Sequence, residues 1–241
     1  MAEMTRPSGH APWRLRARSR PDEALVRGAA VLGLGRFGSA LATELERLGV
    51  EVLGIDADED TVQRHDPLLT AAVRADVSRA EVLDQLGVTQ ADRVVVAVGG
   101  RLEASVLACS HLLRAGVEDL WAKAESAEHA QILEQLGVRH VIMTQRAMGV
   151  RIAHRLVDRA EDWVDYGHGL QMGRFAVPVR MLHQTVAASR VTEEWALRVI
   201  ARRRGDAPWE YVTAQTVLQP GDELIVAGSA EELAAFGRLD S

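Results

Sequence analysis

The residues best suited to chemistry lie in a glycine-rich segment near residue 35. Residues 33–38 read GLGRFG, which is the G-x-G-x-x-G spacing. In that spacing Gly33 permits a tight turn, Gly35 lets backbone N–H groups approach a pyrophosphate, and Gly38 allows a helix and a strand to pack closely. Asp56 follows eighteen residues after Gly38, close to where a carboxylate accepts hydrogen bonds from a ribose 2′-hydroxyl. This combination predicts a nucleotide-binding site.

The segments around the motif supply the elements that must position it. An apolar run at 29–34 leads into the glycines, a helix-patterned segment ends at Leu48-Gly49, and a second apolar run closes on Asp56. Strand, turn, helix and strand in this order favour a nucleotide site over a purely structural turn. Asp56 has a second interpretation, as a residue that helps to cap a helix starting near Asp58, and the two roles are compatible.

Further apolar runs predict a parallel sheet. They are continuous rather than alternating, as in strands that helices cover on both faces. The predicted strands are 29–34, 51–55, 70–75, 93–98, 119–123 and 140–143. Segments typical of a last helical turn and a left-handed glycine recur at 46–50, 84–88, 113–117 and 134–138. A capping box at Ser78 and Glu81 marks another helix start. We therefore predict an α/β fold for residues 28–143, a Rossmann-like doubly wound sheet of strand order 3-2-1-4-5-6.

The remaining chain predicts a smaller second domain. Residues 144–167 form a predicted crossover helix and linker, with the helix at 145–163. Its apolar face, with Met148, Ile152, Leu156 and Val157, packs either on a partner subunit or on the chain's own sheet. Residues 168–241 form a predicted small α+β domain. Its predicted elements are strands at 174–179, 197–202, 210–217 and 223–228, a helix at 183–195, a turn at 219–222, and a last helix that begins with a capping box at Ser229 and Glu232.

Composition narrows the function classes. The chain has 241 residues, 47% apolar and 26% charged, as in ordinary soluble proteins of one or two domains. A net charge of −6 argues against general attraction to nucleic-acid phosphates. The single Cys109 excludes an internal disulfide, and its helix-patterned surroundings favour burial. Residues 1–27, with six arginines and three prolines, predict a flexible basic tail. No signal peptide or membrane span is apparent, so we expect a cytoplasmic protein.

Several motifs in order resemble the RCK proteins, the cytosolic regulatory subunits of Ktr/Trk-type potassium-uptake systems. The resemblance covers residues 28–239. The motifs are GLGRFGSALA (33–42), DADED (56–60), ADVSRAEVL (75–83), VAVGGRLEASVLA (96–108), AKAESAEH (122–129), MGVRIAH (148–154) and TVLQPGDELIVAGSAEELAAF (216–236). The resemblance implies a homodimer that assembles into a homo-octameric ring beneath a membrane-embedded potassium channel subunit, at the inner face of the cell membrane. It also implies gating by ATP, ADP or NAD(H).

The resemblance further implies which residues bind the nucleotide. Gly33, Gly35 and Gly38 form the phosphate turn, Asp56 is the ribose acid, and Asp76 lies near the adenine at the end of the third strand. Arg36 reaches nucleotide phosphates, including those bound in a neighbouring subunit, since a guanidinium pairs with phosphate oxygens in a fixed fork. The rest of the implied cofactor-binding set is Phe37, Ala57, Val77, Gly99, Lys123 and His129.

Two departures and two alternative functions qualify this interpretation. Relatives often carry carboxylates where this chain has Gln145 and Ala147, and hard cations prefer charged oxygen ligands, so we predict no metal site. Arginines 202–204 at a predicted hairpin would suit cyclic di-AMP, but such residues usually face water.

An NAD-dependent oxidoreductase would need a general acid or base near the nicotinamide, and the C-terminal domain offers only His168 and His183, so we expect no enzyme. A regulator of a cation–proton antiporter is equally compatible with the sequence.

Overall fold

Six short strands form a parallel sheet because apolar side chains line both of its faces. In the computed structural model, which describes residues 26–157 and 160–239, the strand order is β3-β2-β1-β4-β5-β6, with every neighbouring pair parallel. The predicted fold class and strand order are confirmed. The strands are β1 (Gly28–Leu32), β2 (Glu51–Asp56), β3 (Ala71–Arg74), β4 (Arg93–Val96), β5 (Leu120–Lys123) and β6 (His140–Ile142).

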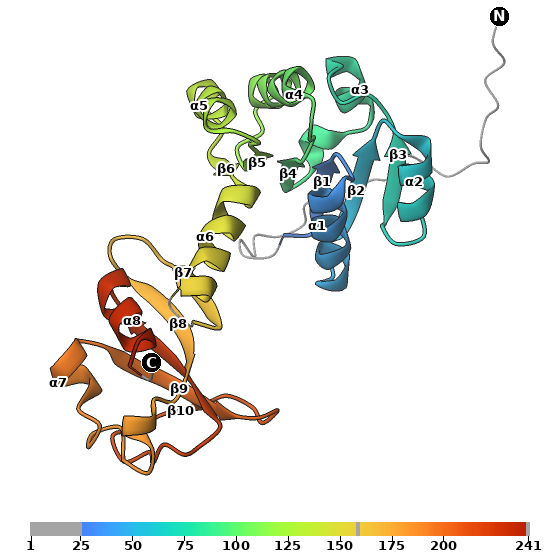
Figure 1. The fold of residues 1–241 in the computed structure, drawn as a ribbon. Helices are drawn as coiled ribbons and strands as arrows, with labels where there is room; N and C mark the ends of the chain where they lie inside the picture. Colours follow the sequence, from blue (N-terminus) through green and yellow to red (C-terminus); the bar gives the residue numbers. More distant parts are fainter. Residues whose placement is uncertain (1–25, 158–159, 240–241) are drawn as a thin grey trace, which may run out of the picture. The chain divides into compact units, whose positions relative to one another are not determined.

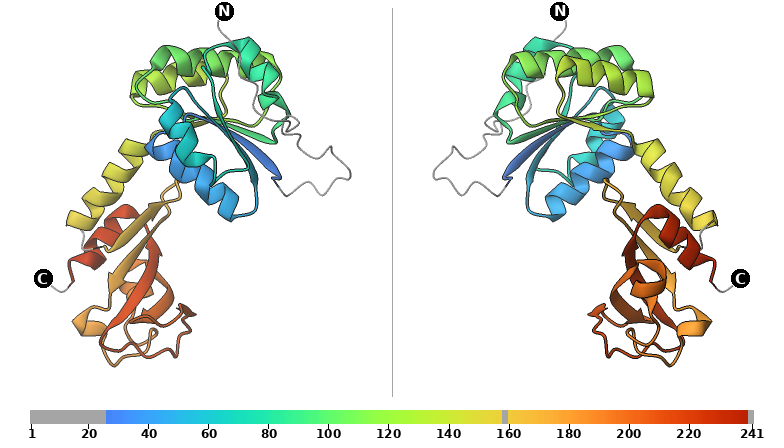
Figure 2. Two further views of the ribbon diagram at one scale, coloured as in Figure 1. Left: turned by 90° about the vertical axis from the view of Figure 1, so that its right-hand side faces the viewer. Right: turned by 90° about the vertical axis from the view of Figure 1, so that its left-hand side faces the viewer.

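Helices cover both faces of this sheet (Figure 1, Figure 2). α1 and α2 lie over one face, and α3, α4 and α5 lie over the other. Val31 of β1 packs with Ala42 of α1, whereas its neighbours Ala30 and Leu32 pack in the core that contains Leu112 of α4. Successive residues of β1 are thus buried on opposite faces, which explains its continuous apolar run. The helices are α1 (Arg36–Arg47), α2 (Glu59–His65), α3 (Ala80–Gln85), α4 (Leu102–Arg114) and α5 (Ala127–Leu136), with a 3-10 turn η1 (Val88–Gln90).

Local signals for helix ends were only partly reliable. Gly49, Gly87, Gly116 and Gly137 all have positive φ, as the recurring helix-end segments predicted. The capping box at Ser78 and Glu81 is wrong. The Ser78 hydroxyl donates to Oδ1 of Asp76 at 2.8 Å, and α3 begins at Ala80, with Arg79 at its N-cap and no side-chain cap. The Ser78 side chain is turned toward the ionised carboxylate of Asp76, a strong acceptor, and does not accept from the N–H of Glu81 as a capping box requires.

The described residues divide into two compact units, and the boundary lies between Thr144 and Gln145. The second contains an antiparallel sheet of order β10-β9-β11-β8-β7. Phe175, Leu224 and Phe236 are among its fully packed core residues. The predicted capping box at Ser229 and Glu232 is confirmed at the start of α8. The elements are α6 (Thr144–Val157), β7 (Asp162–Asp165), β8 (Gln171–Ala176), η2 (Val179–Met181), α7 (Val191–Trp195), β9 (Arg198–Arg204), β10 (Glu210–Tyr211), β11 (Asp222–Gly228) and α8 (Ala230–Gly237).

Three predictions for this unit are wrong. The predicted helix at 183–195 is reduced to α7, because the preceding backbone bonds to another segment: the N–H of His183 donates to the carbonyl of Leu218, and that of Val186 to Thr216. The predicted strand at 210–217 is correspondingly reduced to β10 and an isolated bridge. The predicted helix at 145–163 ends at Val157, since Trp163 belongs to the unpredicted strand β7 and pairs there with Gly173.

The three consecutive arginines of β9 are held by carboxylates of the neighbouring strand. Asp222 is fully buried and accepts hydrogen bonds from Arg204 at 2.6 Å, from Arg202 at 3.3 Å and from the N–H of Gln219 at 2.9 Å. Arg203 pairs in the same way with Glu223. These bonds stabilise the β9–β11 ladder, so an anion at this surface would have to compete with carboxylates for the arginines.

The predicted basic tail at residues 1–27 lies outside the described residues except for Val26 and Arg27. Within residues 26–157 and 160–239, no helix is long and apolar enough to cross a membrane.

Candidate functional site

The glycine turn lies at the carboxyl end of β1, where the strand order reverses between β1 and β4. Gly33 has a φ of +99°, and a Cβ on it would lie 2.9 Å from the backbone nitrogen of Val98, just beyond β4. A Cβ on Gly38 would lie 1.8 Å from the carbonyl oxygen of Gly33. Gly33 therefore lets the turn approach the segment that follows β4, and Gly38 lets α1 pack against the turn. Ligands of open α/β sheets bind at such a reversal of strand order.

Gly35 has a different reason to be glycine. It precedes α1, and a Cβ on it would meet nothing within 4 Å. The space above it is therefore open, and the first N–H groups of a helix have no partner within the helix. The first turn of α1 carries no acidic residue and presents the exposed Arg36. This end of α1 consequently suits a phosphate group.

Asp56 is fixed beside the glycine turn by its own carboxylate. Its Oδ2 accepts a hydrogen bond from the N–H of Leu34 at 2.7 Å, and its Oδ1 accepts one from the N–H of Asp58 at 2.9 Å. The cap of α2 is Asp58, whose side chain accepts from the N–H of Thr61. Asp56 therefore supports that cap indirectly while it ties β2 to the turn. A carboxylate has about four acceptor positions, so capacity remains for ribose hydroxyls. Ala57 follows it and is exposed.

Asp76 lies beyond β3 at the same edge of the sheet. Hydrogen bonds from the Ser78 hydroxyl and N–H hold the pKa of Asp76 below its ordinary value, so the carboxylate is ionised at neutral pH. A guanidinium nitrogen of Arg101, which precedes α4, lies 3.8 Å away. A hollow of about 240 Å³ adjoins this pair, lined by Ser78, Arg101, Leu102, Glu103 and Ala104. It offers space for a planar group beside Asp76 and Arg101.

Gly99 faces a charged pair at the carboxyl end of β5, formed by Lys123, the last residue of the strand, and Glu125. A Cβ on Gly99 would lie 2.9 Å from Oε1 of Glu125 and 3.4 Å from Nζ of Lys123. These two atoms are 3.3 Å apart, and Oε2 of Glu125 accepts from the N–H of Gly100 at 2.8 Å. The bond from Gly100, with help from Lys123 and against the effect of burial, lowers the pKa of Glu125. The carboxylate of Glu125 is therefore ionised at neutral pH.

Not every predicted site residue faces the open edge. Val77 is buried in the sheet core, and Phe37 packs on the core beneath α1. His129 is buried at the first turn of α5, where its Nδ1 accepts a hydrogen bond from the N–H of Glu125. Burial lowers the pKa of His129, although the charge of Glu125 opposes this, so the ring is neutral. These three side chains support the loops that carry the site.

Two residues of the site were missed by sequence reasoning. Arg101 and Glu125 both lie within motifs that carried the family resemblance. Their interactions join loops 25 residues apart in the chain, as between Gly100 and Glu125. The available signal was a charged residue two or three positions after the end of each of two predicted parallel strands, since such residues lie at one edge of the sheet.

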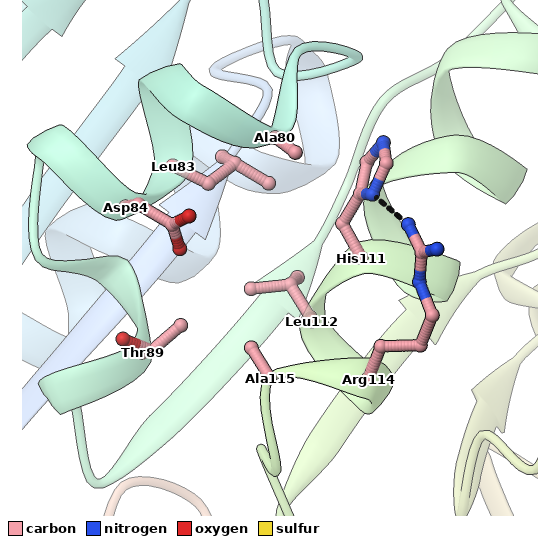
Figure 3. A pocket seen from close by; sticks show the side chains of 8 residues that line it. All are labelled: Ala80, Leu83, Asp84, Thr89, His111, Leu112, Arg114 and Ala115. Carbon is pink, nitrogen blue, oxygen red and sulfur yellow. Dashed lines mark hydrogen bonds between the residues drawn. The ribbon is translucent and has the colours of Figure 1, made fainter.

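A second hollow, of about 290 Å³, lies elsewhere on this unit (Figure 3). Leu83 and Asp84 of α3 line one side, and Leu112 and the hydrogen-bonded pair His111 and Arg114 of α4 line the other. It adjoins the last turns of α4, whereas the glycine turn precedes the first turn of α1. None of the predicted site residues lines it.

Comparison with known proteins covers nearly the whole chain. Residues 29–144 match the TrkA-N domain model. The chain is 34% identical over 206 residues to Ktr system potassium uptake protein A of Vibrio alginolyticus, spanning 85% of this chain and 94% of the relative. It is 31% identical over 208 residues to Ktr system potassium uptake protein C of Bacillus subtilis (strain 168), spanning 86% and 94%.

Solved structures share the fold. The RCK domain of GsuK superposes with a TM-score of 0.62 at 18% identity, over 92% of this chain and 49% of that chain. The GsuK channel bound to NAD superposes with a TM-score of 0.63 at 19% identity, over 95% of this chain and 42% of that chain. This chain thus spans less than half of each solved chain, whereas it spans nearly all of its Ktr relatives. With that coverage and identity, the protein belongs to the family of Ktr system potassium uptake proteins that carry a TrkA-N domain.

Proposed function

We propose that the protein is a nucleotide-binding regulatory subunit of a Ktr/Trk-type potassium-uptake system, and that ATP, ADP or NAD(H) is its ligand. The observation that carries this proposal is the hydrogen bond from the N–H of Leu34 to Asp56. This bond holds the carboxylate that we propose as the ribose ligand beside the glycine turn, which supports the proposal. The names of the Ktr relatives support the link to potassium uptake, and a channel of the same fold that is bound to NAD supports the choice of ligand.

The proposed ligand follows the carboxyl edge of the sheet. Its phosphates lie over Gly35 and the first N–H groups of α1, where Arg36 adds positive charge. Its ribose donates hydroxyl hydrogen bonds to Asp56. The adenine lies toward the hollow beside Asp76 and Arg101. Lys123 lies on the opposite side of the turn, beyond Gly99.

The output of binding is a change of shape that two copies share. None of the side chains of α6 is buried in the described chain, and Met148, Ile152 and Leu156 are 54%, 41% and 80% exposed. Their spacing of four residues places them along one helix face. We propose that this face packs on a second copy and that dimers build a homo-octameric ring at the inner face of the membrane. The nucleotide shifts the ring only if its affinity differs between two ring shapes.

The proposal assigns no catalysis to the chain. An oxidoreductase would require a general acid or base close to the nicotinamide. His168 and His183, the two histidines of the predicted C-terminal domain at 168–241, are exposed loop residues with φ values of 53° and 62°. A regulator of a cation–proton antiporter is the second candidate, because it would use the same nucleotide site. Co-purification with a membrane subunit, identified by mass spectrometry, distinguishes the two partners.

The experiment that tests the proposal is calorimetric titration of the purified full chain with ATP, ADP, NAD⁺ and NADH. We expect the wild type to bind at least one of them and the double variant Asp56→Ala, Gly35→Asp to bind none. Asp60→Ala is the matched control, because this exposed carboxylate of α2 lies outside the site and its loss should leave binding intact. Circular dichroism shows whether each variant is folded. A folded wild type without affinity for any of the four nucleotides would overturn the proposal.

A further inference from the structure

The pair of Lys123 and Glu125 lies immediately beyond the glycine turn. Gly33 approaches the backbone of Val98 so closely that a Cβ on it would be 2.9 Å from the Val98 nitrogen. The next residue, Gly99, approaches the carboxylate of Glu125 in the same way. A ligand group that extends from the glycine turn toward β4 and β5 therefore contacts this pair first.

The position of the pair decides which part of a ligand it contacts. In doubly wound sheets a dinucleotide spans both halves of the sheet across the reversal of strand order. Asp56 and Asp76 assign the adenosine half to the ends of β2 and β3, a step that rests on the proposed function. The part of the ligand beyond the phosphates of the adenosine half then lies over Gly99, Gly100 and Glu125.

The carboxylate, rather than the ammonium group, is the accessible member of the pair. The side chain of Glu125 is 40% exposed, whereas that of Lys123 is 11% exposed. Lys123 is already compensated by Glu125 at 3.3 Å. Glu125 is ionised, because the N–H of Gly100 and Lys123 both stabilise its charge. A ligand at this position consequently meets acceptor oxygens and negative charge.

We infer that Glu125 is a specificity-determining residue that favours NAD(H) over a nucleoside triphosphate. The distal half of NAD(H) carries ribose hydroxyls and a carboxamide, all of which can donate to a carboxylate, and the oxidised ring is cationic. The terminal phosphate of ATP carries additional negative charge and no comparable set of donors. Glu125 repels that phosphate and also occupies Lys123, the cation that would otherwise attract it.

Glu125→Gln tests this inference, because glutamine keeps the length of the side chain and an oxygen acceptor for Gly100 while it removes the charge. We expect the dissociation constant of ATP divided by that of NAD(H), both measured by calorimetry on the full chain, to fall by about tenfold or more. The reason is that one nearby like charge commonly changes an ionic equilibrium by a factor of ten or above. Glu125→Asp keeps the charge and should leave NAD(H) preferred.

The matched control is Glu128→Gln, which removes the same charge from the first turn of α5. Glu128 is exposed and bonds to Ser126 instead of Gly100, so we expect its ratio to equal that of the wild type. An unchanged ratio in Glu125→Gln, or an equal change for both nucleotides, would overturn the inference and leave nucleotide binding standing. Equal shifts of the ratio in Glu125→Gln and Glu125→Asp would also overturn it, because a purely structural role does not depend on charge. A wild type that binds neither nucleotide would instead refute the proposed function.

Discussion

Replacing Gly38 by alanine should destabilise the nucleotide-binding unit far more than replacing Gly35, although both belong to one motif. A Cβ on Gly38 would lie 1.8 Å from the carbonyl oxygen of Gly33 and 3.2 Å from Cβ of Ala97. Real Cβ contacts stay above 3.0 Å, so the first contact is short by about 1.2 Å. The colliding oxygen belongs to the backbone, and the Cβ of Ala97 is fixed directly to it, so no side-chain rotation relieves either contact. The start of α1 would have to move away from the turn.

The two substitutions differ in expected magnitude for this steric reason. Overpacking costs about 1–3 kcal/mol and more where backbone must shift, so we expect about 3 kcal/mol for Gly38→Ala and a Tm lower by about 6–12 °C. At Gly35 a Cβ meets nothing within 4 Å and φ is −68°. Gly35→Ala should therefore change the free energy of unfolding by less than about 0.5 kcal/mol. Its methyl group should still weaken nucleotide binding at least tenfold, about 1.4 kcal/mol, because it enters the space proposed for phosphate.

Thermal unfolding followed by circular dichroism measures the first difference, and calorimetric titration with NADH and ATP measures the second. Each variant serves as the control for the other. Equal destabilisation by both substitutions would refute the steric interpretation of the turn. A fully stable Gly35→Ala protein with wild-type affinity would refute the placement of phosphate over Gly35.

Three further expectations concern the rest of the chain. Burial raises the pKa of Asp222, but its bonds to Arg204 and neighbouring groups outweigh this effect and hold the pKa below the ordinary 3.8. The stabilising contribution of Asp222 is therefore complete above that value and is lost as pH falls through the lower folded pKa. Urea titrations between about pH 5 and 2 should show a fall in stability that Asp222→Asn makes shallower, and an identical slope in the variant would contradict this. Burial raises the pKa of the Cys109 thiol to about 12, so thiol reagents at pH 8 should label it only after unfolding, and rapid labelling of the native protein would be the opposite result. Phe236 is 2% exposed with its ring 5.3 Å from that of Phe175, so Phe236→Ala should cost about 3–5 kcal/mol in denaturant titrations, and a loss below about 1 kcal/mol would show that the core is assigned wrongly.

The parallel sheet was predictable because burial on both faces leaves a simple trace in the sequence. Val31 and Leu32 are both fully buried although they point to opposite faces, so β1 reads as an unbroken apolar run. Glycine spacing and the acid after β2 then located the turn. Cys109 was correctly expected to be buried for a similar local reason.

Features that depend on distant partners were not predictable. The Ser78 hydroxyl had two possible uses, and the geometry of the neighbouring Asp76 decided between them. The amphipathic pattern at 183–190 looked helical, but the backbone of 214–218 satisfies its hydrogen bonds instead. Glu125 acquired its role only when folding brought it to the N–H of Gly100. Residue types can be read along the chain, whereas competition between partners is settled in three dimensions.

The most direct test of a nucleotide-controlled regulator is potassium flux through proteoliposomes that contain the membrane subunit of a Ktr system together with this protein. We expect flux to change when NADH, NAD⁺, ADP and ATP are exchanged, and the Asp56→Ala variant to bind the vesicles but give one flux under all four conditions. Flux from the wild type that is the same with every nucleotide and without any would contradict the account.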